Sequence, residues 1–182
     1  MKTYTRKVIP IDRSIEEKLA LMESKEYGEK CEEGQFLYLT LDLPPTPLFR
    51  DEMSENIIPQ VPLSHLLAKF DGITEKEYKT YKDSFLKRFV ITKFPKYLIL
   101  YIKRFNQNTF FLEKNPTIVN FPVKNVDLSE LLEPESRKDQ NACYDLIANI
   151  VHEGAPESGK GTYRIHLLHK VSAKCHKICA FS

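Results

Sequence analysis

Cysteine is scarce in this sequence and is never spaced as in a typical structural zinc site. The chain has 182 residues and four cysteines, at positions 31, 143, 175 and 179, with no Cys-x-x-Cys pair. Structural zinc sites usually take their ligands from such pairs. We therefore expect no zinc site of that kind. Because the thiols are scattered and nothing suggests secretion, we expect them to be reduced.

Long apolar runs and a strong charge of either sign are also missing. Residues 1–7 contain no apolar stretch, so we expect no signal peptide. The longest apolar run is about one short strand, far below the ~20 residues of a membrane span. The net charge is only +2, which by itself does not indicate nucleic-acid binding. These features predict a soluble globular protein with no membrane contact and no direct nucleic-acid contact.

Local patterns predict two helices. Ser14 and Glu17 form a capping box, and apolar residues follow at helical spacing as far as Met22. Residues 63–70 place four apolar side chains on one helical face, and Asp71-Gly72 ends that helix.

Other segments have the alternation or apolar character of strands. These are residues 36–43, 97–102, 144–152 and 162–169. Residues 97–102 are apolar on both faces, which predicts a central strand covered on both sides. Residues 106–108 resemble a hairpin loop that leads into a strand at 109–112. The proline-rich stretch 44–62 is expected to be an extended connection.

Three further segments complete the expected organisation. In residues 74–89, the spacing of Tyr78, Tyr81 and Phe85 predicts a helix. Residues 127–132 are expected to form one helical turn, and residues 133–141 and 153–161 are expected to be loops. Many antiparallel strands with a few helices make an α+β domain.

Three motifs together resemble a known protease domain. They are residues 95–105 (PKYLILYIKRF), residues 118–128, which begin IVNFP, and residues 144–152, which precede Gly161-Thr162-Tyr163. This pattern resembles the C-terminal half of a ubiquitin-specific protease (peptidase C19) domain. The resemblance implies an incomplete domain over residues 1–169, made of the antiparallel palm and fingers of a papain-like fold. It also implies finger strands at 74–89 and a divergent tail at 170–182.

The resemblance also implies that the catalytic residues are missing. The last motif reads Gly-His-Tyr in active members of the family, and its His is the general base, whereas Thr162 occupies that position here. A hydroxyl cannot exchange a proton near pH 7 as imidazole does. No Gly-Asn-Thr-Cys box occurs, and residues 170–182 contain no Asp or Asn to orient a base. We therefore expect no peptidase activity.

Some remaining residues leave alternatives open. Cys143 is expected to be a packed or half-exposed thiol rather than a nucleophile. His152 is expected to be a surface residue at a loop edge rather than a displaced base. Cys175, His176 and Cys179 resemble half of a metal site, but the second ligand pair is missing, so we interpret them as a chance cluster. No cofactor is expected.

Several residues are candidates for partner binding. Tyr78, Tyr81 and Phe110 could act as aromatic anchors. Lys103 and Arg104 end an apolar strand and could frame a cleft. The basic residues between 79 and 88 alternate with aromatic ones, which would suit RNA, but a solvated basic face over an apolar one is the preferred interpretation.

A finer resemblance narrows the expected function. Residues 57–62, 72–78 and 113–122 are similar to the inactive subfamily of these proteases that belongs to the spliceosomal tri-snRNP. This implies a nuclear, non-catalytic scaffold that contacts tri-snRNP proteins, with ubiquitin as a second candidate partner. Two alternatives stay open: a working deubiquitinase, and a truncated fragment without an independent function.

Overall fold

The computed structural model describes residues 1–45, 58–107, 112–155, 160–168 and, for the backbone only, 176–181. Contacts divide the chain into two units. Unit 1 consists of Met1–Phe36, Ala68–Lys93 and Glu130–Gln140. Unit 2 consists of Leu37–Leu67, Phe94–Ser129 and Asn141–Ser182.

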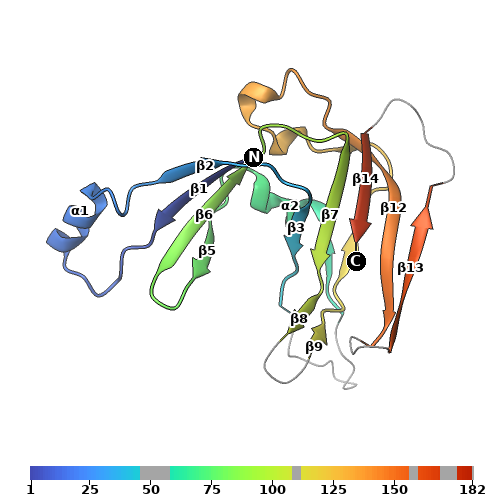
Figure 1. The fold of residues 1–182 in the computed structure, drawn as a ribbon, viewed down its shortest axis with the longest axis horizontal. Helices are drawn as coiled ribbons and strands as arrows, with labels where there is room; N and C mark the ends of the chain where they lie inside the picture. The colour runs from blue at the N-terminus through green and yellow to red at the C-terminus, as the bar shows by residue number, and fades with distance from the viewer. Residues whose placement is uncertain (46–57, 108–111, 156–159, 169–175, 182) are drawn as a thin grey trace. The chain divides into compact units, whose positions relative to one another are not determined.

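Unit 1 is built on a four-stranded antiparallel sheet in the order β2-β1-β6-β5 (Figure 1). Its strands are β1 (Lys2–Lys7), β2 (Lys30–Glu33), β5 (Lys76–Lys79) and β6 (Ser84–Val90). β6 is an inner strand, since it pairs with β1 along its whole length and with β5 on its other side. The finger strands implied for residues 74–89 are therefore present.

The helix predicted for residues 74–89 from aromatic spacing is wrong. The amide of Thr80 donates to the carbonyl of Asp83 (2.8 Å), and the amide of Asp83 donates to Thr80 Oγ1 (3.0 Å), which closes a turn between β5 and β6. Tyr78 and Phe85 face each other across this hairpin. The helix-like spacing of Tyr78, Tyr81 and Phe85 therefore belongs to two strands joined by a short turn. The pairing of β6 with β1 favours this hairpin over a helix.

Unit 1 buries few apolar side chains and relies on paired charges. Its buried hydrophobic residues are Phe70, Val90, Ile91 and Leu132. Arg6 binds Glu75 through two hydrogen bonds of 2.7 and 3.2 Å. Other ion pairs join Lys7 to Glu26 and Asp83, Arg88 to Glu29, and Lys2 to Glu133.

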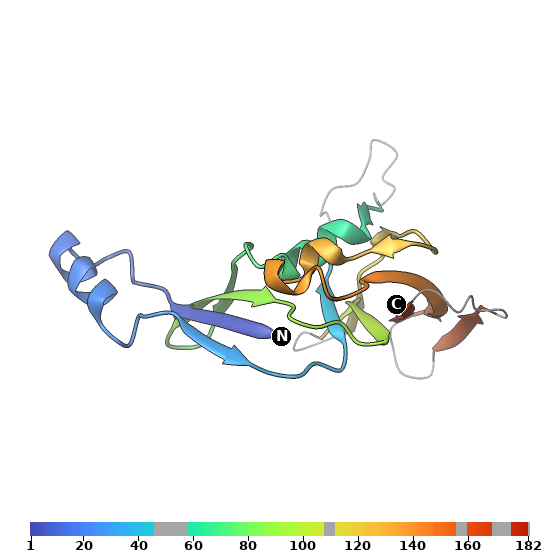
Figure 2. The same cartoon turned by 90° about the horizontal axis from the view of Figure 1, so that it is seen from above.

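Helix α1 (Ile15–Glu23), which is drawn in Figure 2, begins with the predicted capping box. The Glu17 amide donates to Ser14 Oγ (3.2 Å), and the Ser14 amide donates to Glu17 Oε2 (3.1 Å). The helix lies in the connection between β1 and β2 and has no buried residue. It is therefore stabilised by its own caps and not by a core.

Unit 2 contains a six-stranded sheet with the order β11-β12-β14-β7-β3, in which β13 pairs with β12 (Figure 1). The strands are β3 (Leu39–Asp42), β7 (Tyr97–Lys103), β11 (Val126–Asp127), β12 (Cys143–Gly154), β13 (Gly161–Leu167) and β14 (His176–Phe181). β7 pairs in parallel with β3 and β14, and β12 pairs in parallel with β14 but antiparallel with β13. Among the described strands of both units, antiparallel pairing predominates, which confirms the α+β class. The segment expected to be a divergent tail supplies β14, between β12 and β7.

The core of unit 2 lies against one face of β7. Leu98, Leu100 and Ile102 are buried, whereas Tyr97 and Tyr101 on the opposite face are exposed. The prediction that this strand is covered on both sides is therefore wrong. Its central position in the sheet is correct. Aromatic residues on the open face gave the segment its continuous apolar character.

The predicted second helix is present. It consists of α2 (Leu63–Leu67) followed by a 3-10 turn (Ala68–Phe70), and Leu63, Leu66, Leu67 and Phe70 are buried as the pattern predicts. Gly72 follows with a φ of 78°, a conformation that glycine adopts readily. Most of the predicted extended stretch before the helix lies outside the described residues. Its end forms β4 (Gln60–Pro62), which pairs in parallel with β10 (Ile118–Asn120).

The predicted hairpin after Lys103 also forms, with shifted strands. β8 (Phe105–Gln107) pairs with β9 (Leu112–Lys114), so Asn106 and Gln107 belong to a strand and not to a loop. A 3-10 turn (Ser129–Leu131) lies within the helical turn predicted at 127–132, and a second one (Pro134–Ser136) interrupts the predicted loop. In the part of the chain that is described, no helix has the length and apolarity to cross a membrane.

Candidate functional site

Thr162, which the resemblance places at the position of the general base, lies on an exposed strand. Thr162 is the second residue of β13, is exposed, and pairs with Glu153 of β12. The next pair along the strands is Tyr163 with His152. Because side chains alternate along a strand, Thr162 and Glu153 point to one face of the sheet, and Tyr163 and His152 to the other. His152 is therefore not a substitute imidazole in the place of Thr162.

His152 is buried, which corrects the expectation of a surface residue at a loop edge. Only 8% of it is exposed. Its ring lies between those of Phe105 (5.1 Å between centroids) and Tyr163 (4.9 Å). Alternation from the fully buried Tyr144 could not have predicted this burial, because a register shift between Leu146 and Ala148 interrupts the alternation along β12.

The glycine before Thr162 is needed to accommodate this ring. A β-carbon built on Gly161 would collide with Nε2 of His152 and lie 2.6 Å from its Cε1. Gly161 pairs with Gly154, whose φ is 96°. The two glycines thus let the ends of β12 and β13 approach closely beneath the imidazole.

Neither cysteine whose side chain is described lies beside this histidine. Cys143 begins β12 and is half-buried. His152 lies nine positions further along the same strand, and at ~3.3 Å per residue this corresponds to about 30 Å. Cys31 is exposed on β2 of unit 1. Cys143 therefore forms no thiol–imidazole pair with His152.

A pocket of about 460 Å³ with both polar and apolar walls lies beside His152 in unit 2. Its polar lining comes from the end of β7, from β9 and the turn after it, and from β12. Arg104, Lys114, Asn115, Thr117, Asn149 and His152 supply the polar groups, and Ile102, Pro116, Ile118, Val119 and Phe121 supply the apolar walls. Among the described residues, the polar groups of this lining are amides, a hydroxyl, an imidazole and two cations, all of which can form hydrogen bonds.

The two cations of the pocket bind backbone carbonyls. Nη1 of Arg104 donates to the carbonyls of Thr117 (2.5 Å) and Asn115 (3.2 Å), and burial lowers the pKa of Arg104. Nζ of Lys114 donates to the carbonyl of His152 (2.6 Å). These bonds join the chain around β9 and β10 to β7 and β12. Part of the role of the two cations is therefore structural.

Two polar atoms among the pocket residues are buried without a hydrogen-bond partner, within the described part of the chain. They are Oγ1 of Thr117 and Nδ1 of His152. The rest of this region is well paired, since Nδ2 of Asn115 donates to the carbonyl of Pro44 (2.8 Å) and its Oδ1 accepts the Thr117 amide (3.0 Å). Both unpaired atoms are shielded, so a molecule in the pocket would not reach them directly.

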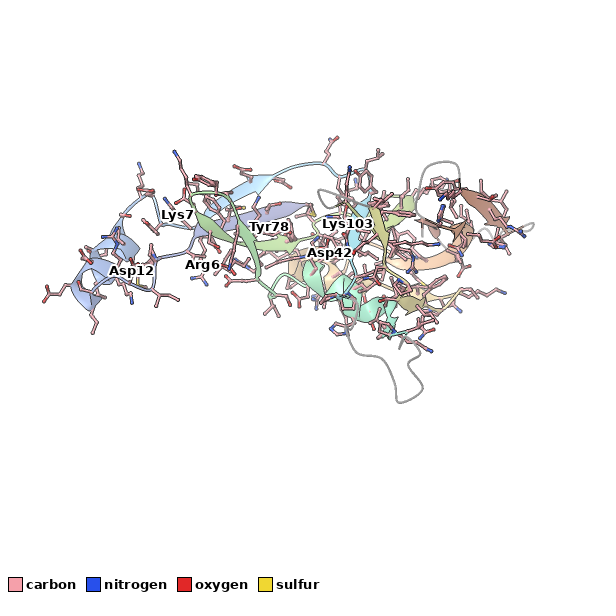
Figure 3. The ribbon with its side chains drawn as sticks, turned by 90° about the horizontal axis from the view of Figure 1, so that it is seen from below. Arg6, Lys7, Asp12, Asp42, Tyr78 and Lys103 are labelled. Atoms are coloured by element: carbon pink, nitrogen blue, oxygen red, sulfur yellow. The ribbon has the colours of Figure 1, made fainter. Side chains whose placement is uncertain are left out.

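The other candidate binding residues are distributed over both units of the chain. Lys103 is exposed and in register with Asp42 of β3, and Figure 3 labels both, whereas Arg104 lines the pocket. Tyr78 and Tyr81 belong to unit 1, where Tyr81 is fully exposed at the hairpin turn and Tyr78 packs edge-on against Phe89. Phe110 lies outside the described residues. The binding roles of these residues stay predictions.

The chance cluster of Cys175, His176 and Cys179 falls where no side chain is described. Cys175 and the side chains of His176 and Cys179 lie outside the described part of the chain. Within the part that is described, no group of three or more His, Cys, Asp or Glu residues is arranged to hold a metal ion.

Comparison with known proteins decides the family. A family model described as ubiquitin carboxyl-terminal hydrolase matches residues 10–178. The chain belongs to this family. It is 56% identical over 179 residues to human ubiquitin carboxyl-terminal hydrolase 39, a match that covers 98% of the chain and 31% of the relative. The mouse protein of the same name gives the same identity and coverage. The chain thus spans less than a third of the length of these family members.

Two further matches extend the comparison. The chain is 38% identical over 148 residues to a Schizosaccharomyces pombe protein named probable mRNA-splicing protein ubp10, covering 79% of the chain and 29% of that protein. A solved structure of the SAGA Ubp8/Sgf11/Sus1/Sgf73 DUB module aligns with a TM-score of 0.53 at 18% identity, covering 94% of the chain and 33% of the matched chain. At this identity the solved structure supports the fold alone.

Proposed function

We propose that this chain acts in pre-mRNA splicing as a non-catalytic ubiquitin-specific-protease-like protein. In this role it binds proteins of the spliceosomal tri-snRNP in the nucleus. Two comparisons support the proposal: the 56% identity to ubiquitin carboxyl-terminal hydrolase 39, and the similarity to a relative whose name states a splicing role. The resemblance of residues 57–62, 72–78 and 113–122 to the tri-snRNP subfamily supports the finer assignment.

Thr162 is the single observation that carries the non-catalytic part of the proposal. A cysteine protease needs a general base within hydrogen-bond reach of its nucleophile. Thr162 stands where the family has that base, on an exposed strand. The neighbouring imidazole of His152 points to the opposite face and is enclosed by two aromatic rings. Losing one member of such a triad can lower the rate by ~10⁴-fold or more.

The catalytic question is tested with a ubiquitin probe that carries a C-terminal electrophile. We expect the purified chain to form no covalent adduct with it. An adduct that disappears in the Cys143→Ala variant, but not in Cys31→Ala, would contradict the proposal and favour the alternative of a working deubiquitinase. An active deubiquitinase treated in parallel provides the positive control.

The splicing role is tested by co-sedimentation with purified tri-snRNP. We expect the chain to migrate with the particle and to be released as the salt concentration rises. Migration at the position of the free chain under all conditions would contradict the proposal. A cooperative thermal transition of the same preparation separates this outcome from the alternative of an unfolded fragment.

A further inference from the structure

The apolar face of helix α1 is largely exposed. Ile15, Leu19 and Met22 are 78%, 58% and 65% exposed. They are separated by four and three residues, so they form a single stripe along the nine-residue helix. The preceding Ile11 is 91% exposed. Nothing in unit 1 covers this stripe among the described residues.

The helix is held in its conformation by local contacts. A helix of nine residues is marginal in water on its own. Ser14 and Glu17 cap its start reciprocally, and both the amide and the hydroxyl of Ser24 donate to the carbonyl of Leu21 at its end (3.1 and 2.8 Å). Nζ of Lys18 also donates to the carbonyl of Ile11 (2.9 Å). The apolar stripe is therefore presented in a preorganised form.

The base of the connection is fixed to the sheet of unit 1. Lys7 at the end of β1 forms an ion pair with Glu26 (2.7 Å) and lies over the ring of Tyr27 (5.3 Å). Arg88 of β6 binds both carboxylate oxygens of Glu29 (3.1 and 3.2 Å). Figure 1 shows α1 beyond the ends of β1 and β2, and Figure 3 labels Lys7 and Asp12 in this region. Preorganisation of this kind reduces the entropy lost on binding.

The charges beside the stripe are asymmetric. At about 100° per residue, Glu16 and Glu23 fall on one flank of the stripe and Lys18 on the other. In the described structure neither glutamate forms an ion pair. Residues 11–23 hold four acidic and two basic residues, a net charge of −2, whereas the whole chain has a net charge of +2. The helix is thus an acidic projection on a slightly basic chain.

From these observations we propose that α1 is a docking helix for a protein partner. The partner offers an apolar groove that receives Ile15, Leu19 and Met22, with lysine or arginine along the rim that faces Glu16 and Glu23. This is the helix-in-groove mode of recognition, in which residues at i, i+4 and i+7 act as anchors. The acidic flank disfavours an anionic membrane surface and a nucleic acid as the occupant. The inference rests on the proposed function, because the partner is sought among tri-snRNP proteins.

The test measures co-sedimentation of the 182-residue chain with purified tri-snRNP. We expect the Ile15→Gln/Leu19→Gln double variant to bind at least ~10-fold more weakly, since central anchors dominate such interfaces. Glutamine keeps a high helix propensity, and the replaced side chains are exposed, so the fold should be unchanged. The matched control is Ile73→Gln, because Ile73 is an exposed isoleucine elsewhere in unit 1, and it should bind as the unchanged chain does.

A separate test concerns the attraction between the acidic flank of α1 and the basic rim of the partner's groove. Glu16→Lys/Glu23→Lys should slow association and weaken binding most at low salt, whereas Glu135→Lys, on an exposed turn of unit 1, should have no effect. A photo-crosslinker at position 19 should give adducts with peptides that contain lysine or arginine. Adducts with a second copy of the chain, or depletion of the chain by phosphatidylcholine vesicles, would overturn the inference.

Failure of this inference is distinguishable from failure of the proposed function. If the unchanged chain does not migrate with tri-snRNP, the proposed function is wrong and the inference fails with it. If the unchanged chain migrates with the particle and the stripe variant does so equally well, only the assignment of α1 is wrong. Circular dichroism of each variant verifies that loss of binding is not loss of folding.

Discussion

The contact between Gly161 and the imidazole of His152 gives a sharp stability prediction. In a Gly161→Ala variant the new methyl group would collide with Nε2 of His152 and lie 2.6 Å from Cε1 and 3.1 Å from the carbonyl oxygen of Ala155. Phe105 and Tyr163 flank the ring on two sides, so it can move away only toward the neighbouring pocket.

The expected cost follows from two opposing effects. Overpacking a well-filled site destabilises a protein by ~1–3 kcal/mol, and the loss of glycine's freedom in the unfolded chain restores ~0.4–1 kcal/mol. We therefore expect a net loss of about 1–2 kcal/mol in the free energy of unfolding. Gly34→Ala is the matched control, because no atom lies within 4 Å of its built β-carbon. That variant should be neutral or slightly stabilised.

Urea unfolding of four proteins forms the assay: the unchanged chain, Gly161→Ala, His152→Ala and the double variant. If the collision with the ring causes the loss, Gly161→Ala should cost almost nothing in the His152→Ala background. The coupling energy between the two substitutions should be about 1–2 kcal/mol. An equal cost of Gly161→Ala in both backgrounds would refute the steric explanation and point to the backbone instead.

Two further predictions concern buried or capping groups and their pH dependence. The hydroxyl of Tyr144 donates to the carbonyl of Pro95 (2.5 Å), so Tyr144→Phe should lower stability by ~1 kcal/mol. Burial raises the pKa of Tyr144, so above about pH 10 the tyrosine ionises in the unfolded chain before it does in the folded one. The difference in stability between the unchanged chain and Tyr144→Phe should therefore shrink as the pH rises. Urea midpoints at about pH 8 and about pH 10.5 measure this change. For Asp71, partial burial opposes ionisation, but hydrogen bonds from the side chain and amide of Thr74 together lower its pKa. Its contribution is present above about pH 4 and is lost at lower pH, so Asp71→Asn should be less stable at pH 7 and nearly equal at pH 3; a difference that grows on acidification would contradict this.

Local signals in the sequence predicted local structure well. The capping box at Ser14 fixed the start of α1, and the pattern from Leu63 to Phe70 gave both the second helix and its buried face. Each of these signals depends on contacts between residues three or four positions apart. A short window of sequence is therefore enough to predict each of these helices.

The wrong predictions from sequence concern features that depend on long-range strand pairing and burial. The hairpin at residues 74–89 is decided by the pairing of β6 with β1, about 80 residues earlier, which no local pattern contains. The burial of His152 depends on Phe105 and Tyr163, which come from two other strands. The resemblance implied the role of the Thr162 position, which stays a prediction, and only the sheet register shows that His152 points to the opposite face.

The small core of unit 1 should make local unfolding easier in unit 1 than in unit 2. Its sheet is supported by ion pairs such as Arg6 with Glu75, whereas unit 2 buries the leucine-rich face of β7. Exposed ion pairs contribute little, and salt screens them. Backbone amides of β1 and β6 should therefore exchange their hydrogens for deuterium sooner than those of β7, and the gap should widen as ionic strength rises.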